Sequence, residues 1–138
     1  MPGLQGGHGR RTVTEDTITP DAIVRCITSA RVPPGLSENE IHVMIAAALL
    51  NGGFDVRHEA AIAPRCRIDF LIGGVGLEIK KGRPQRVKLM RQSEKYLALK
   101  VIDALILVVE RNVFMPRFIC GKPVFVIGLN KQWGIALP

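Results

Sequence analysis

The chain has 138 residues, 47% of them hydrophobic, and a formal net charge of +7, which fits one domain with an ordinary hydrophobic core. No apolar run approaches the about 20 residues of a membrane span, and no apolar segment follows Arg10 and Arg11 as it would in a secretory signal. The cysteines, Cys26, Cys66 and Cys120, are odd in number and far apart, which favours reduced thiols in the cytoplasm and argues against a structural zinc site.

The first predicted elements are an arm and a short helix. Residues 1–18 are rich in Gly, Arg and Thr and lack hydrophobic periodicity, which predicts a flexible arm ahead of a single domain over 19–138. Pro20 followed by Asp21 is typical of a helix start, so a short helix is expected over about 20–30.

A second helix is predicted over about 37–50. Ser37 and Glu40 have the spacing of a capping box, in which each side chain accepts a hydrogen bond from the main-chain amide of the other residue. The sequence Asn-Gly-Gly at 51–53 is typical of a helix end.

Strand and helix patterns alternate in the rest of the chain. The run at 104–109 is continuously apolar, as expected for a strand buried on both faces. The predicted elements are strands at about 54–62, 67–72 and 75–80, a helix at about 86–100, a strand at 104–109, and a terminal hairpin of 124–127 and 133–137 with its turn at 128–131. This order predicts an α/β (α+β) fold, with a mixed central β-sheet flanked by helices and an added C-terminal β-hairpin. The apolar hairpin is a candidate surface for a homodimer.

Three charged residues interrupt the two apolar runs that meet at a glycine-rich bend. Successive side chains of a strand point to opposite faces, so Glu78 and Lys80 share one face, and pairing of the two strands lets Asp69 project toward it. Isolated charges are costly to bury. These three groups therefore either pair with one another as a structural ion cluster or hold a divalent metal ion.

The pattern Asp69-x8-Glu78-x-Lys80, in this order of helices and strands, resembles the PD-(D/E)XK nuclease superfamily over about residues 37–110. The resemblance implies a restriction-endonuclease-like core. It also implies that Asp69, Glu78 and the main-chain carbonyl of Ile79 bind Mg²⁺ or Mn²⁺, and that Lys80 assists the attacking water.

The same resemblance suggests further residues of the catalytic site. Many members add a Glu from the first core helix, which implies a catalytic and metal-binding role for Glu40, with the capping box as an equal and compatible alternative. The neighbouring His42 is expected at a surface or interface rather than as a ligand. RecB-type members carry Gln and Tyr on the helix after E-x-K, which implies catalytic roles for Gln92 and Tyr96. The alternative is a solvated Gln92 beside a Tyr96 at the edge of the core.

Basic charge is concentrated in one part of the chain. Residues 57–100 contain eleven Lys and Arg against four Asp and Glu, an excess of seven positive charges. This excess equals the net charge of the whole chain. A localised basic field is typical of a polyanion partner, most simply DNA, with a solvated basic surface as the alternative. The candidate phosphate contacts are Lys81, Arg83, Arg86, Lys88, Arg91 and Lys95.

Together these patterns predict a Mg²⁺- or Mn²⁺-dependent deoxyribonuclease that hydrolyses DNA phosphodiester bonds. Similarity to small Holliday junction resolvases and VRR-NUC nucleases implies an endonuclease of junction or branched DNA in recombination and repair, which would act as a homodimer. Two alternatives remain open. One is a non-catalytic nucleic-acid-binding accessory module, and the other is a protein outside nucleic-acid chemistry that carries an ion cluster.

Overall fold

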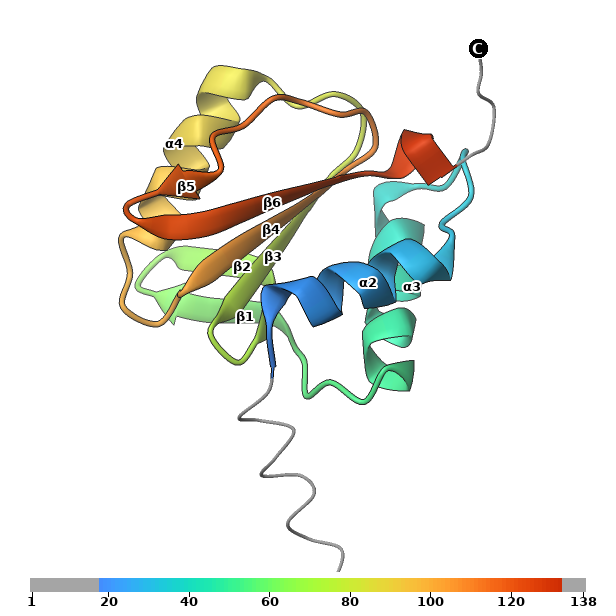
Figure 1. The fold of residues 1–138 in the computed structure, drawn as a ribbon, viewed down its shortest axis with the longest axis horizontal. Helices are drawn as coiled ribbons and strands as arrows, with labels where there is room; N and C mark the ends of the chain where they lie inside the picture. The colour runs from blue at the N-terminus through green and yellow to red at the C-terminus, as the bar shows by residue number, and fades with distance from the viewer. Residues whose placement is uncertain (1–17, 133–138) are drawn as a thin grey trace, which may run out of the picture.

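The structure is a computed structural model that describes residues 18–132, and Figure 1 shows the order of its elements. The helices are α2 (Pro20–Ala30), α3 (Glu38–Asn51) and α4 (Arg86–Leu97). The strands are β1 (Arg57–Ala63), β2 (Cys66–Ile72), β3 (Val75–Lys80), β4 (Ala104–Val109), β5 (Phe118–Ile119) and β6 (Lys122–Gly128), and a 3-10 helix η1 (Leu129–Gln132) follows β6. Within this part of the chain, no helix has both the length and the apolar character needed to cross a membrane.

The strands of the described region form one mixed sheet in the order β1-β2-β3-β4-β6-β5. Strands β1, β2 and β3 form an antiparallel meander, β3, β4 and β6 run parallel, and β5 is an antiparallel edge strand. Helices α2 and α3 cover one face of the sheet and α4 covers the other (Figure 1). This arrangement confirms the predicted α/β fold class, with a mixed sheet flanked by helices.

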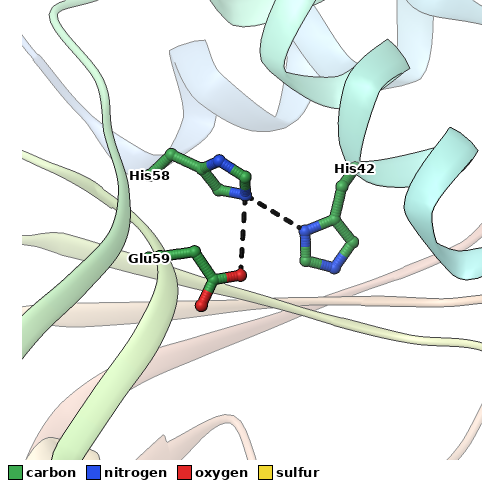
Figure 2. Close-up of side chains that lie close together, drawn as sticks. All are labelled: His42, His58 and Glu59. Atoms are coloured by element: carbon green, nitrogen blue, oxygen red, sulfur yellow. Dashed lines mark hydrogen bonds and ion pairs between the residues drawn. The ribbon is translucent and has the colours of Figure 1, made fainter.

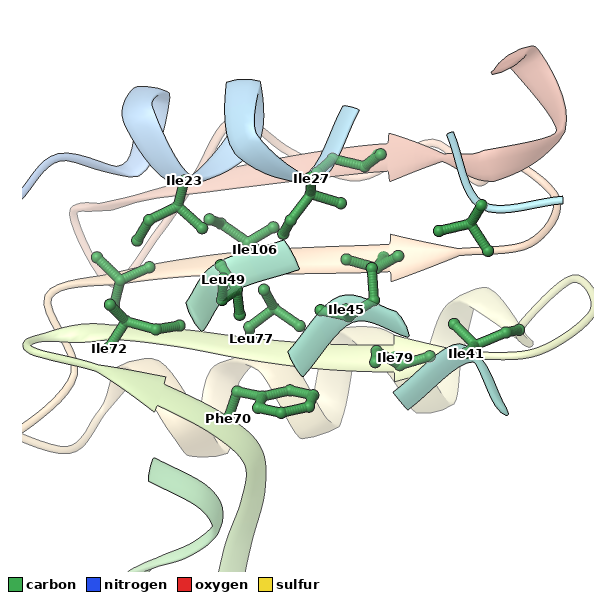
Figure 3. Close-up of a cluster of buried hydrophobic side chains, with 14 of the residues drawn as sticks. Ile23, Ile27, Ile41, Ile45, Leu49, Phe70, Ile72, Leu77, Ile79 and Ile106 are labelled. Atoms are coloured by element: carbon green, nitrogen blue, oxygen red, sulfur yellow. The ribbon is translucent and has the colours of Figure 1, made fainter. Parts of the chain in front are cut away.

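Strand β4 is central in the hydrophobic core, and all of its residues are buried, as its continuous apolar sequence predicts. Its side chains alternate between two clusters. Those packed under α2 and α3 are Ala104, Ile106 and Val108, and those packed under α4 are Leu105, Leu107 and Val109. Figure 3 shows the first cluster, in which isoleucines of α2 and α3 lie over Leu77 of β3 and Ile106 of β4.

Side-chain caps fix the N-termini of α2 and α3. The Thr19 hydroxyl accepts a hydrogen bond from the amide of Ala22 at 3.2 Å. In α3, the Ser37 hydroxyl accepts from the Glu40 amide at 3.1 Å, and the Glu40 carboxylate accepts from the Ser37 amide at 2.8 Å. The predicted capping box is therefore present, and such a cap contributes about 1 kcal/mol to stability.

The first strand of the predicted C-terminal hairpin, 124–127, lies within β6. Strand β6 lies between β4 and β5, so its hairpin partner is the short strand that precedes it. After β6 the chain enters η1 at the predicted turn, and the predicted strand at 133–137 lies outside the described residues. The Lys122 ammonium donates to the carbonyls of Leu99 at 2.9 Å and Ile102 at 2.6 Å. Strand β6 is thereby joined to the loop between α4 and β4.

The core of α3 offers a direct test of this packing. Ile45 is fully buried whereas Val43, two residues earlier on the same helix, is 61% exposed. We expect Ile45→Ala to lower the free energy of unfolding by about 2–5 kcal/mol, because the truncation leaves a cavity. Val43→Ala should change it by about 0.5 kcal/mol or less. Urea unfolding followed by circular dichroism measures both, and equal effects would contradict the position of α3.

Candidate metal centre

Strands β2 and β3 separate at Asp69. Their main-chain pairing extends from the two-residue turn at Gly73 only as far as Phe70 and Leu77. Beyond this point the Asp69 amide donates to the Glu78 carboxylate at 3.2 Å, and the Ile79 amide donates to the Asp69 carboxylate at 2.8 Å. Two carboxylate side chains therefore take the place of the carbonyl partners that a regular ladder would supply.

The strands on either side of Asp69 depart from regular extended geometry. Ile68 and Phe70 pack in opposite core clusters, although residues two apart in a strand normally share a face. Strand β1 pairs His58 with Phe70 and Ala60 with Ile68. Glu59 lies between these pairs and has a φ of 54°. This left-handed conformation costs a residue with a β-carbon roughly 1–2 kcal/mol. The kink explains why Asp69 lies in the gap between β2 and β3 rather than on one face of the sheet.

From the face under α4, three side chains contact Glu78. The Tyr96 hydroxyl lies 3.2 Å from Oε1, the Gln92 amide lies 3.4 Å from Oε2, and the Lys80 ammonium lies 3.5 Å from Oε2. The Gln92 amide also donates to the Tyr96 oxygen at 3.0 Å. Burial and the nearby Glu78 charge raise the pKa of Tyr96 far above its usual range. Tyr96 therefore stays protonated, and it can donate to Glu78 or to the carbonyl of Arg67 at 3.1 Å.

From the opposite face, α3 presents His42 to Asp69. The His42 Nε2 atom lies 3.6 Å from Asp69 Oδ2 and 3.8 Å from Glu38 Oε2. The prediction that His42 lies at a surface or interface is wrong, because the residue is buried. It shares the apolar stripe of Ile45 and Leu49, at spacings of three and seven residues, and this periodicity was the signal that could have revealed it.

Glu40 occupies a different position from His42 on the same helix. It lies in the first turn, where its carboxylate is bound to the Ser37 amide. This hydrogen bond lowers the pKa of Glu40, which is otherwise fully exposed. Among the described residues, the contacts of the Glu40 side chain are those of the capping box, and His42 is the α3 residue that contacts Asp69.

Two partly buried carboxylates so close together are electrostatically unfavourable. Burial raises the pKa of Asp69, against the lowering effect of the Ile79 amide. Burial also raises the pKa of Glu78, and the Asp69 charge raises it further. The Lys80 ammonium lowers both pKa values, but burial outweighs it. An additional cation in the gap would stabilise both charged forms.

The oxygen atoms around the gap fit a hard divalent cation. The amide and carbonyl of one strand residue point to the same side of the strand. Because the Ile79 amide points to Asp69, the Ile79 carbonyl also points into the gap. The next carbonyl, that of Lys80, points the other way and accepts from the Glu110 amide at 3.0 Å. Carboxylate and carbonyl oxygens are the donors that Mg²⁺ and Mn²⁺ prefer.

Of the six predicted phosphate contacts, two are engaged inside the protein. The Lys81 ammonium lies 3.3 Å from the Glu110 carboxylate, and the Arg86 guanidinium donates to the carbonyl of Phe114 at 2.9 Å. The other four, Arg83, Lys88, Arg91 and Lys95, are exposed and have no ion-pair partner among the described residues. A hollow of about 380 Å³ is lined by Lys80, Lys88 and Gln92, among other residues. It lies between α4 and Lys80, and two of its lining residues, Lys80 and Gln92, contact the Glu78 carboxylate.

Comparison with models of protein families, with curated proteins and with solved structures finds no match to this chain. The case for a function therefore rests on the sequence pattern and on the geometry described above.

The pKa of Glu78 is raised and that of Glu40 is lowered, so a Glu-to-Gln substitution at each position should change the pH dependence of stability in opposite directions. Above the ordinary carboxyl pKa of 4.5, native Glu78 retains its proton while the unfolded chain has lost it, so wild-type stability falls as pH rises toward the raised value. Glu78→Gln should remove this loss and gain stability relative to wild type between about pH 4 and about pH 7.

Glu40→Gln is the matched control. The lowered pKa of Glu40 contributes stability that is present above its ordinary value of 4.5 and is lost as pH falls. Relative to wild type, this variant should therefore lose stability as pH rises toward 4.5, and the difference should stay constant at higher pH. Urea unfolding in metal-free buffer measures both differences, and slopes of the same sign would contradict the assigned environments.

Proposed function

We propose that the protein is a divalent-metal-dependent deoxyribonuclease that hydrolyses phosphodiester bonds at the gap between β2 and β3. The observation that supports this most is the convergence of Asp69, Glu78 and Lys80 from adjacent strands. The Glu78 carboxylate lies 3.2 Å from the Asp69 amide and 3.5 Å from the Lys80 ammonium. The resemblance to PD-(D/E)XK nucleases concerns these same three residues.

The metal ion in this proposal is Mg²⁺ or Mn²⁺, held by Asp69, Glu78 and the Ile79 carbonyl. When bound, such an ion neutralises the charge that develops on the phosphate and lowers the pKa of a coordinated water. Lys80 is half-buried beside Glu78, where its ammonium would hold the attacking water against the phosphorus.

Gln92 and Tyr96 act as positioning residues in this scheme. Their hydrogen bonds to the Glu78 oxygens hold one orientation of that carboxylate, and the bond between them fixes the pair. Since Tyr96 is buried, it is assigned to Glu78 rather than to the substrate.

The basic surface of α4 suggests how DNA would approach. The hollow beside Lys80 could take one phosphate, and the exposed cations of α4 would contact neighbouring phosphates without reading sequence. Such contacts suit recognition of DNA shape, as in junction or branched substrates. Symmetric cleavage of a junction would also need a two-fold homodimer.

The nuclease proposal predicts metal-dependent cleavage that two near-isosteric variants slow strongly. We expect the wild type to cleave at least one of a panel of end-labelled junction, flap, duplex and single-stranded DNAs with Mn²⁺. Asp69→Asn and Lys80→Met should each slow cleavage by about 10²–10⁴-fold, because each removes a group that acts on the reacting atoms. Arg25→Met, exposed on α2, should cleave as the wild type does.

Binding without cleavage of any substrate, in Mg²⁺ or Mn²⁺, would instead favour the non-catalytic accessory module. Absence of both salt-sensitive binding and cleavage would leave a structural ion cluster as the remaining interpretation.

The DNA surface can be tested separately by the salt dependence of binding. Lys88→Ala and Arg91→Ala should each reduce the slope of log binding constant against log salt concentration by about 1, because each removes one phosphate contact. Arg25→Ala, on the far side of the sheet, should leave the slope unchanged. Fluorescence anisotropy with labelled DNA at several salt concentrations measures the slopes, and an equal effect of Arg25→Ala would exclude α4 as the specific contact surface.

A further inference from the structure

A second group of metal-type donors lies beside the carboxylate pair. We propose that His42, His58 and Glu59 bind a transition-metal ion of the Zn²⁺ class, at a site distinct from the oxygen-donor site of Asp69 and Glu78. Each of the three residues supplies one ligand atom, and these atoms all lie within 4.8 Å of one another (Figure 2). This site goes beyond the nuclease proposal and does not depend on it.

The distances suit one small ion. His42 Nδ1 lies 3.3 Å from His58 Nε2, and His58 Nε2 lies 3.7 Å from the nearer Glu59 oxygen (Figure 2). Two nitrogen ligands of a tetrahedral zinc ion, each at about 2.0–2.1 Å from the metal, are roughly 3.3 Å apart. A small shift of the exposed Glu59 side chain would complete three corners of such a tetrahedron.

Both imidazole rings are held in position by their surroundings. Phe70 is fully buried beneath them, stacked on His58 at 4.6 Å between ring centroids and tilted against His42 at 5.7 Å. The second nitrogen of His42 faces the carboxylates of Asp69 and Glu38 at 3.6 and 3.8 Å. Metal-binding histidines almost always direct their second nitrogen to a carboxylate, a main-chain carbonyl or water, which fixes the tautomer and leaves the other lone pair for the metal.

The donor set determines which metals would bind. Two imidazole nitrogens and one carboxylate favour Zn²⁺ and its transition-metal neighbours, whereas Mg²⁺ prefers oxygen donors alone. The side chains of His58 and Glu59 are 50% and 54% exposed, so the fourth position of the ion would face solvent. Three protein ligands with an open fourth position are typical of zinc sites that bind water or an anion.

The left-handed backbone of Glu59 agrees with this assignment. In a regular strand, His58 and Glu59 would project to opposite faces of the sheet. With a φ of 54° at Glu59, both side chains instead reach His42. The strained backbone at this residue thus places two adjacent side chains beside one metal position.

The alternative is that His42 and His58 share a hydrogen bond, in which one nitrogen donates and the other accepts. That arrangement needs no metal and gives the pair no metal affinity beyond that of any exposed histidine. Metal binding by the full, metal-free chain separates the two interpretations.

The experiment is a calorimetric titration with Zn²⁺, together with Co²⁺ titration followed by visible absorption. We expect one tight site per chain in wild type, an intense tetrahedral Co²⁺ spectrum, and persistence of both in excess Mg²⁺. His58→Gln and Glu59→Gln should each weaken Zn²⁺ binding by at least about tenfold, or about 1.4 kcal/mol. Because both side chains are half-exposed, the thermal unfolding temperature of each variant without metal should match that of the wild type.

Two variants serve as controls for adventitious binding. His8→Gln removes the remaining histidine, and Cys120→Ser removes an exposed thiol. Each should leave Zn²⁺ affinity and the Co²⁺ spectrum unchanged. The proposal is overturned if the wild type binds no more tightly than His58→Gln, or if either control variant removes the binding. DNA cleavage does not enter these measurements, so failure here leaves the nuclease proposal intact.

Discussion

The separation of β2 from β3 is the constraint on which the candidate site depends. At Asp69 the main-chain ladder ends, and the amides of Asp69 and Ile79 are satisfied by carboxylates instead. A regular ladder would have turned these residues onto alternate faces of the sheet and paired the Ile79 carbonyl with β2. The gap therefore orients both side-chain and main-chain oxygens toward one point. It also explains why the carboxylates cannot be removed without leaving buried amides unpaired.

His42 connects two donor sets of different chemical character. One of its nitrogens faces the carboxylate of Asp69, and the other faces His58. The oxygen atoms around Asp69 and Glu78 suit a hard cation, whereas the imidazoles on the far side suit a softer one. A proton or metal on one nitrogen determines whether the other donates or accepts a hydrogen bond. The two positions are therefore coupled electrostatically through a single ring.

The sequence predicts the regular part of this structure well. The alternation of Glu78 and Lys80, the capping box at Ser37 and the buried strand β4 follow from local periodicity, and each is present. The kink at Asp69 is different, because it arises where side chains replace main-chain partners across two strands. No periodicity marks such a site.

The contributions of α3 and β1 were the least predictable from sequence. The resemblance implied a metal-binding role for Glu40, but its carboxylate binds the Ser37 amide, and His42 is the α3 residue that contacts Asp69. For His42 the apolar stripe of α3 carried a usable signal. For Glu59 none existed, because a left-handed φ at a glutamate is imposed by the neighbouring strand and not by its own preference.

The position of Lys122 limits when the domain can assemble during translation. Strand β4 receives its second neighbour only from β6, and Lys122 of β6 also anchors the loop that leads into β4. The parallel partner β6 follows β4 in the chain, so it is unavailable to β4 until residues 122–128 have been synthesised. The helices and the β1–β3 meander emerge from the ribosome earlier, while one edge of β4 stays unpaired. An apolar strand with an open edge is prone to aggregate, so β4 is the segment that a nascent chain must keep from other chains until β6 arrives.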